Sequence, residues 1–207
     1  MKDVEAVGKR PGMYIGSTED ISALQEMAFA LVANAINESL AGYCSHIDVV
    51  FNPDGSATVR DDGRGLPVDL DPMKKASKAE LIMTSSTAAG WFEQYPESTD
   101  LLDGASAFVV NALSAWLTLH IWRDGRVHFM RFREGHPEAP LQAVGSSNGK
   151  RGTEIEFLPD PGIFTVTRFH MEALEHRLRN LAGLNARVTI ILEDRRGKSS
   201  KKAEINL

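Results

Sequence analysis

The residues best suited to chemistry lie in the run DDGRGLP at positions 61–67. An ionised carboxylate such as that of Asp61 is a strong acceptor for hydrogen bonds. Gly63 and Gly65 have no Cβ, so the backbone there can approach a ligand or another segment closely. Taken alone, this pattern is more often an ordinary hairpin loop than a binding site.

Two further polar residues, Asn34 and Glu38, are four positions apart. That spacing puts them on one face of an α-helix, one turn from each other. The plain interpretation of Asn34 alone is a helix-surface asparagine. A site built mainly from histidine and cysteine is not expected, because the six histidines and the single cysteine show no spacing typical of metal ligands.

Hydrophobic periodicity predicts the elements that must position these residues. Apolar residues recur at helical spacing over 23–40, with Ser22 as the candidate N-cap. Extended runs at 46–52 and 57–60 flank a Pro-Asp-Gly turn, which predicts a hairpin leading into the glycine-rich loop. The segment 7–17 contains a proline and several glycines, so it is predicted to be turn-rich.

The rest of the chain alternates between helical and extended patterns. Helices are predicted at 73–83, 105–113 and 167–181, and strands at 116–122, 126–133, 152–157 and 187–193. This organisation favours an α+β two-layer sandwich formed by a single domain over residues 1–207. Residues 84–104 lack a clear pattern, and a stretch of that length is usually a functional lid or disordered.

Composition limits the possible partners. The net charge is −5, whereas surfaces that grip DNA phosphates are usually basic, so we expect no direct DNA contact by this chain. The basic cluster 195–202 is interpreted as a solvated turn or tail. One cysteine and no long apolar run predict a cytoplasmic protein without a disulfide framework or a membrane span.

Six runs of sequence, taken in order, resemble the N-terminal domain of the B subunit of DNA gyrase and its topoisomerase IV counterpart. They extend from about residue 7 to residue 198, and their common order argues against chance. The resemblance implies the ATP-binding sandwich shared by gyrase, Hsp90, histidine kinases and MutL, with a mixed, mostly antiparallel sheet, helices on one face and 84–104 as an ATP lid. The runs are VGKRPGMYIGS, NAINESLAGYCSHIDVVFNPDGSATVRDDGRGLPVD, FVVNALSAWLTLHIWRDGRVH, EAPLQAVG, KRGTEIEFLPDPGIF and LRNLAGLNARVTIILEDRRGK.

The resemblance also implies roles for single residues. Asp61 would accept a hydrogen bond from the adenine amino group, supported by Thr153, and the amide of Asn34 would help to hold Mg²⁺ on the phosphates of ATP. Glu38 and Arg64 would pair beside the adenine pocket, where aminocoumarin-type inhibitors also bind. The implied nucleotide-binding residues are Asn34, Glu38, Asp61, Gly63, Arg64, Gly65, Pro67 and Thr153, with Asn34 as the metal ligand.

The chain departs from the family pattern where the reaction would occur. The family's general base, a glutamate that activates the attacking water, corresponds to Ala30, whose methyl group cannot accept a proton. Two family aspartates correspond to Ala33 and Asn37. Glu26 is one helical turn, roughly 5–6 Å, before Ala30, and a shift of ~1 Å can already cost about a hundredfold in rate. No catalytic residue is therefore assigned.

The phosphate-binding lid departs as well. The family's Gly-Leu-His-Gly-Val-Gly run corresponds to residues within 101–107, where Gly104 is kept, Asp103 replaces the histidine and Ser106 replaces the last glycine. A carboxylate near phosphates is repulsive. In addition, Phe129 occupies the position of an arginine that contacts inhibitors in the family.

Three functions stay open from the sequence. The first is weak binding of an adenine nucleotide or an aminocoumarin-like ligand, with little or no ATP hydrolysis. The second is a working ATPase fragment of a gyrase or topoisomerase IV subunit, with Glu26 as an unorthodox base. The third is a module that pairs with gyrase subunits or sequesters inhibitors.

Overall fold

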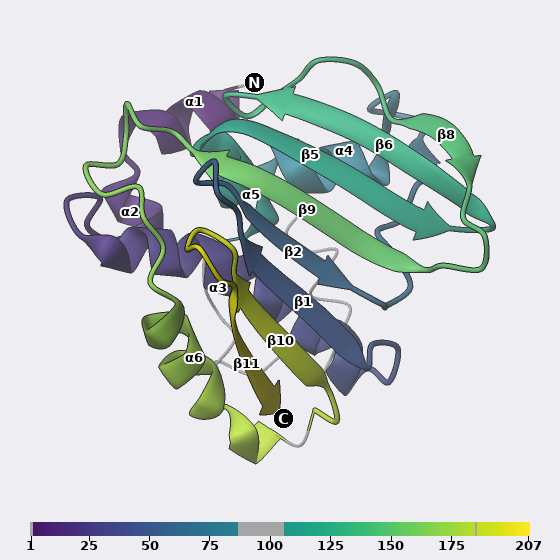
Figure 1. The fold of residues 1–207 in the computed structure, drawn as a ribbon. Coiled ribbons are helices and arrows are strands. Elements are labelled where there is room, and N and C mark those ends of the chain that lie inside the picture. Colours follow the sequence, from purple (N-terminus) through teal and green to yellow (C-terminus); the bar gives the residue numbers. More distant parts are fainter. Residues whose placement is uncertain (1, 87–105, 185) are drawn as a thin grey trace.

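A computed structural model describes residues 2–86, 106–184 and 186–207. Its main feature is a nine-stranded sheet in the order β11-β10-β1-β2-β9-β5-β6-β7, with β8 paired to β6 (Figure 1). Strand β1 runs parallel to β10, and the other described pairs are antiparallel. The strands are β1 His46–Phe51, β2 Ala57–Asp61, β5 Ser114–Arg123, β6 Arg126–Arg133, β7 His136–Pro137, β8 Gln142–Ser146, β9 Gly152–Pro159, β10 Thr189–Asp194 and β11 Lys201–Asn206.

The helices gather on one side of this sheet (Figure 1). The long helix α3 packs between α6 and α5 and contacts β1 and β2. A separate two-stranded ladder, β3 Leu70–Asp71 with β4 Ala76–Ser77, leads into α4. The helices are α1 Lys2–Lys9, α2 Gly12–Ile15, α3 Ile21–Leu40, α4 Lys78–Thr84, α5 Ala107–Ala112, α6 Met171–Arg179 and the 3₁₀ turn η3 Ala182–Leu184. The predicted α+β sandwich with a mixed, mostly antiparallel sheet is confirmed.

The alternation of buried and partly exposed residues along the strands explains how the sheet packs against the helices. On β5, Leu117, Leu119 and Ile121 are fully buried, while the residues between them are partly exposed. A strand directs successive side chains to opposite faces, so these three side chains meet the helical layer. Within that layer, 13 of the 20 residues of α3 are buried. The sequence signal for α3 was therefore strong; the predicted helix is confirmed, although it begins at Ile21, two residues before the predicted start.

The prediction of a turn-rich start was wrong. Residues 2–9 and 12–15 form helices α1 and α2, in spite of the proline and glycines between and within them. Val4 and Val7 are buried in the common core, and packing of this kind overrides weak intrinsic propensity. The predicted N-cap of α3 was also wrong, because Asp20 is the cap and its side chain accepts a hydrogen bond from the Ser22 amide at 2.8 Å.

Two other predicted elements need correction. The helix expected over 73–83 begins only at Lys78, because the preceding residues form the β3–β4 ladder and Ser77 caps the helix. Part of the basic cluster, interpreted as a turn or tail, is strand β11, in which Lys202 lies opposite Glu193. No helix in the described part of the chain has the length and apolar character needed to span a bilayer.

Candidate functional site

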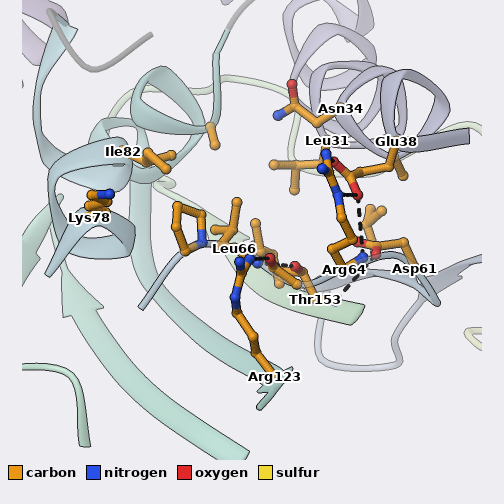
Figure 2. Close-up of a pocket in the computed structure, with 16 residues that line it drawn as sticks. Leu31, Asn34, Glu38, Asp61, Arg64, Leu66, Lys78, Ile82, Arg123 and Thr153 are labelled. Atoms are coloured by element: carbon orange, nitrogen blue, oxygen red, sulfur yellow. Dashed lines mark hydrogen bonds and ion pairs between the residues drawn. The ribbon is translucent and has the colours of Figure 1, made fainter. Parts of the chain in front are cut away.

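A pocket of about 490 Å³ lies between α3, the loop after β2, α4 and strands β5 and β9 (Figure 2). Seven of the eight nucleotide-binding residues predicted from the sequence line it; Gly63 is the exception. The seven are Asn34, Glu38, Asp61, Arg64, Gly65, Pro67 and Thr153. The fold therefore brings together residues that are more than a hundred positions apart in the sequence.

Asp61 is a half-buried carboxylate that lines this pocket. It ends strand β2, and its Oδ1 accepts hydrogen bonds from the backbone amides of Gly63 at 2.8 Å and Thr153 at 3.3 Å. Burial raises the pKa of Asp61 to about 6, and the two backbone donors oppose that rise only in part. At neutral pH the side chain is therefore mostly an anion that presents an acceptor to the cavity.

The neighbouring carboxylate, Asp62, binds residues at and just before the start of β1. Burial acts to raise its pKa, but hydrogen bonds from Ser45 and His46 outweigh that effect and lower the pKa to about 2. Its oxygens accept from the Ser45 amide and hydroxyl, both at 2.7 Å, and from the His46 amide at 3.0 Å. Asp62 thus ties the loop to the start of β1, while Asp61 faces the pocket.

Glu38 and Arg64 join α3 to the loop. Nη2 of Arg64 lies 2.8 Å from Oε1 of Glu38, and Nε lies 3.1 Å from Oε2. This is the two-point geometry in which a guanidinium binds a carboxylate best. The guanidinium also lies 3.8 Å from the centre of the Tyr43 ring. The predicted pairing is confirmed, and Tyr43 is a contact that the sequence reasoning missed.

Thr153 and Arg123 fix the other side of the loop. The hydroxyl of Thr153 accepts a hydrogen bond from the Leu66 amide at 3.2 Å, and Nη1 of Arg123 donates to the Gly65 carbonyl at 2.7 Å. Arg123 was not predicted as a site residue. Phe129, which the resemblance places at an inhibitor-contacting arginine of the family, packs against His120 with ring centroids 4.9 Å apart.

Glycines are required where the loop meets β9. A Cβ on Gly63 would lie 2.8 Å from Oδ1 of Asp61, and a Cβ on Gly65 would meet three atoms at 3.0 Å. Gly65 also has a φ of 76°, which favours glycine. The most crowded position is Gly152, where a Cβ would lie 1.9 Å from the Asp61 carbonyl oxygen. These glycines let the loop lie directly against β9.

Asn34 faces the pocket from α3, and Lys78 and Ile82 lie across the cavity on α4 (Figure 2). The start of α5 contributes Ala107. Lys78 and Ile82 were missed as site residues, although their spacing of four places both on one face of a predicted helix. No cluster of three or more histidine, cysteine, aspartate or glutamate side chains suited to a metal occurs among the described residues.

Two positions of α3 at which the resemblance implies carboxylates are apolar. Ala30 and Ala33 are buried at 2% and 3% exposure. Glu26, the candidate substitute base, forms an ion pair of 2.6 Å with Arg177 of α6 and does not line the pocket. Arg177 is itself stacked 3.5 Å over the Phe29 ring. Glu26 therefore takes part in the contact between α3 and α6.

Most of the predicted lid, residues 84–104, lies outside the described residues, as do Asp103 and Gly104. Of the altered lid run, Ser106 is described and precedes the first turn of α5 as its N-cap, without a side-chain capping hydrogen bond.

Comparison with known proteins supports the resemblance. No protein-family model matches the chain. The DNA gyrase B subunit of Rickettsia typhi is 48% identical over 205 residues, which is 99% of this chain and 25% of the relative. The same protein of Caulobacter vibrioides is 46% identical over 95% of this chain, and that of Synechocystis 44% over 99%. The chain spans about a quarter, or less, of the length of these relatives.

The sheet order, the helical layer and the pocket beside the glycine-rich loop define an α+β sandwich of the gyrase and Hsp90 type. Within that class, the chain is homologous to the B subunit of DNA gyrase over nearly all of its own residues.

Proposed function

We propose that this chain is the nucleotide-site domain of a type II topoisomerase B subunit and binds an adenine ring, or a flat inhibitor of the aminocoumarin type, with little or no ATP hydrolysis. The observation that carries the proposal is the Asp61 carboxylate. It is half-buried at the pocket wall, and both hydrogen bonds described for it end on Oδ1. Its other oxygen is able to accept from an exocyclic amine, and such a charge-assisted bond is stronger in a partly desolvated site.

The surrounding residues fit a planar ring. Leu31, Val59 and Ile155 supply apolar walls, and the paired Arg64 supplies a flat guanidinium at the rim. The Thr153 hydroxyl accepts a hydrogen bond from the Leu66 amide and so holds the loop at the pocket wall. Ligand sites commonly combine such apolar walls with a few convergent polar groups.

Asn34 is the residue that would hold Mg²⁺ together with the phosphates of a nucleotide. A single amide oxygen suits this ion, which usually takes one or two protein ligands and keeps several waters. Bound Mg²⁺ would neutralise phosphate charge. Because positions 30 and 33 are alanines, no carboxylate at either position can share the ion with Asn34, so we propose that magnesium-nucleotide binding is weak.

The absence of ATP hydrolysis is proposed from the contacts that hold each carboxylate that could act as a general base. The two carboxylates that line the described pocket are Glu38 and Asp61. Glu38 is held by Arg64 at two points, and Asp61 is held by backbone amides. Because Glu26 pairs with Arg177, it also lacks the geometry of a base directed at the cavity.

As part of a longer polypeptide, the domain would have other gyrase subunits as partners.

The adenine role is tested by calorimetric titration of the full chain with ADP. Asp61→Asn is expected to weaken binding about tenfold or more, because an amide replaces the charged acceptor. Asp48→Asn, an exposed substitution on β1 that removes the same charge, is the matched control. Equal affinity in Asp61→Asn and the unmodified chain would contradict the proposed adenine contact.

A further inference from the structure

Lys78 is a charged residue of the pocket to which neither the resemblance nor the proposed function gives a role. It is the first residue of α4, and it lines the cavity together with Ile82, one turn further along the same helix. In Figure 2 it lies across the pocket from Asn34, Glu38 and Asp61. A ligand that reaches from Asp61 across the cavity would therefore approach the lysine with its opposite end.

The position of Lys78 is fixed by its neighbour Asp69. The backbone amide of Lys78 donates to the Asp69 carbonyl at 2.8 Å, and its ammonium lies 3.6 Å from Oδ2 of the same residue. The Ser77 side chain caps the helix by accepting from the Glu80 amide at 3.1 Å. The base of the lysine side chain is consequently anchored at the mouth of the pocket.

The ion pair with Asp69 is one that a ligand can displace or join. The Asp69 side chain is 68% exposed and that of Lys78 is 37% exposed. Exposed pairs of this kind contribute little, because water and salt screen them. An anion held in the cavity by another contact would meet the same ammonium in a less hydrated place, where the attraction is larger.

The two arginines that line the pocket are held by contacts with the loop and with neighbouring carboxylates. The Arg64 guanidinium is engaged by Glu38 at two points. The guanidinium of Arg123 donates to the Gly65 carbonyl, and its Nε lies 3.6 Å from Asp124. An ammonium on a flexible four-carbon stem, by contrast, can follow an anion without breaking the contacts that hold the loop.

We propose that Lys78 is a specificity-determining residue that binds an anionic group on the end of the ligand opposite the Asp61-bound ring, without a metal ion. The ligand class is then a planar heterocycle that donates a hydrogen bond at one end and carries a phosphate or carboxylate at the other. This inference rests on the proposed function, because it needs the ring to be placed at Asp61.

The test is a metal-free calorimetric titration of the full chain, with a chelator present, using three probes: adenosine, adenosine 5′-carboxylate and AMP. They share the ring and differ in the group at the 5′ position. The unmodified chain is expected to bind AMP, the carboxylate or both about threefold or more tightly than adenosine, within the range of a partly exposed ion pair. The anionic probe that binds more tightly shows whether the site prefers a phosphate or a carboxylate.

Lys78→Met is expected to abolish this preference, so that the anionic probes bind no more tightly than adenosine. Lys78→Arg should keep the preference, and Lys198→Met, which removes the same charge from the exposed turn between β10 and β11, should keep it as well. A preference that survives Lys78→Met would overturn the inference, as would equal binding of the three probes by the unmodified chain. If no probe binds the unmodified chain, the proposed function itself fails, so the two failures are distinguishable.

Discussion

Arg64 in the glycine-rich loop and Glu38 on α3 form a two-point ion pair, with contacts of 2.8 Å and 3.1 Å, that fastens the loop to the helix. The pair is supported by the backbone amide of Arg64, which lies 3.3 Å from Oε2 of Glu38. The same contact thus shapes the rim of the pocket and stabilises the fold.

Glu38→Ala is expected to lower the free energy of unfolding by about 1–2 kcal/mol, since a charged hydrogen-bonded group loses its partner but is partly screened by solvent. Urea denaturation measures this change. The matched control is Glu175→Ala, which breaks the exposed pair with Arg179 and should cost less than about 0.5 kcal/mol. Equal losses in the two variants would show that the Glu38 pair behaves as an ordinary surface contact.

Gly152 should be among the positions least tolerant of substitution. An alanine there would place its Cβ 1.9 Å from the Asp61 carbonyl oxygen, at a φ of 114°. We expect Gly152→Ala to lose about 3 kcal/mol or more, or to prevent folding. Gly149 also has a positive φ but has open space around its Cβ position, so Gly149→Ala should lose only about 1–2 kcal/mol. Similar thermal denaturation midpoints for both variants would contradict the close contact.

Ligand binding should depend on pH through Asp61. Its pKa, raised by burial to about 6, means that the acceptor is lost as the pH falls through that value. Adenosine, which has no titrating phosphate, should therefore bind about tenfold more weakly at pH 5 than at pH 7. Asp61→Asn should remove this dependence. A flat affinity profile for the unmodified chain would indicate that the carboxylate does not contact the ring.

The same pKa shift has the opposite sign for folding. Between the ordinary value of 3.8 and about 6, the folded chain holds a proton on Asp61 that the unfolded chain has released. The contribution of Asp61 to stability is therefore most favourable below this window and falls as the pH rises through it. Asp61→Asn is expected to flatten this part of the stability profile measured by denaturation from pH 4 to pH 7.

Glu26→Ala distinguishes the proposed binding domain from a working ATPase. Because Glu26 pairs with Arg177, its loss should reduce stability by about 1 kcal/mol without altering ATP turnover, which we expect to be at background in both proteins. Measurable turnover in the unmodified chain that disappears in Glu26→Ala would contradict the account and support the unorthodox base. Glu175→Ala again serves as the control for loss of an ion pair.

Much of the fold follows from local pattern. The periodicity of α3 and the alternation on β5 are strong because each element buries a continuous face, so both were predicted correctly. Helix α1 was missed because its stability comes from burying Val4 and Val7 against distant residues. Strand β11 was missed because its sequence is rich in lysine, and its pairing depends on Glu193 and Asp194 across the ladder.

The candidate site was predicted less evenly. Asp61, Arg64 and Thr153 were found through sequence runs that resemble a family, and the structure brings them into one pocket. Lys78 lies outside those runs, and Arg123 lies inside one of them but was given no role. Their place in the site depends on the β3–β4 ladder and on the alignment of β5 with β9, which only the folded chain shows.

The most direct test of the central claim is calorimetric titration of the full chain with novobiocin and, separately, with ATP and Mg²⁺. We predict binding of novobiocin, with ATP-magnesium at least about tenfold weaker than ADP without metal, because the resemblance implies that the ring end of the pocket is kept and that three helix carboxylates are replaced. Tight, magnesium-dependent ATP binding would contradict the account. It would show that the chain holds the phosphates as well as the ring.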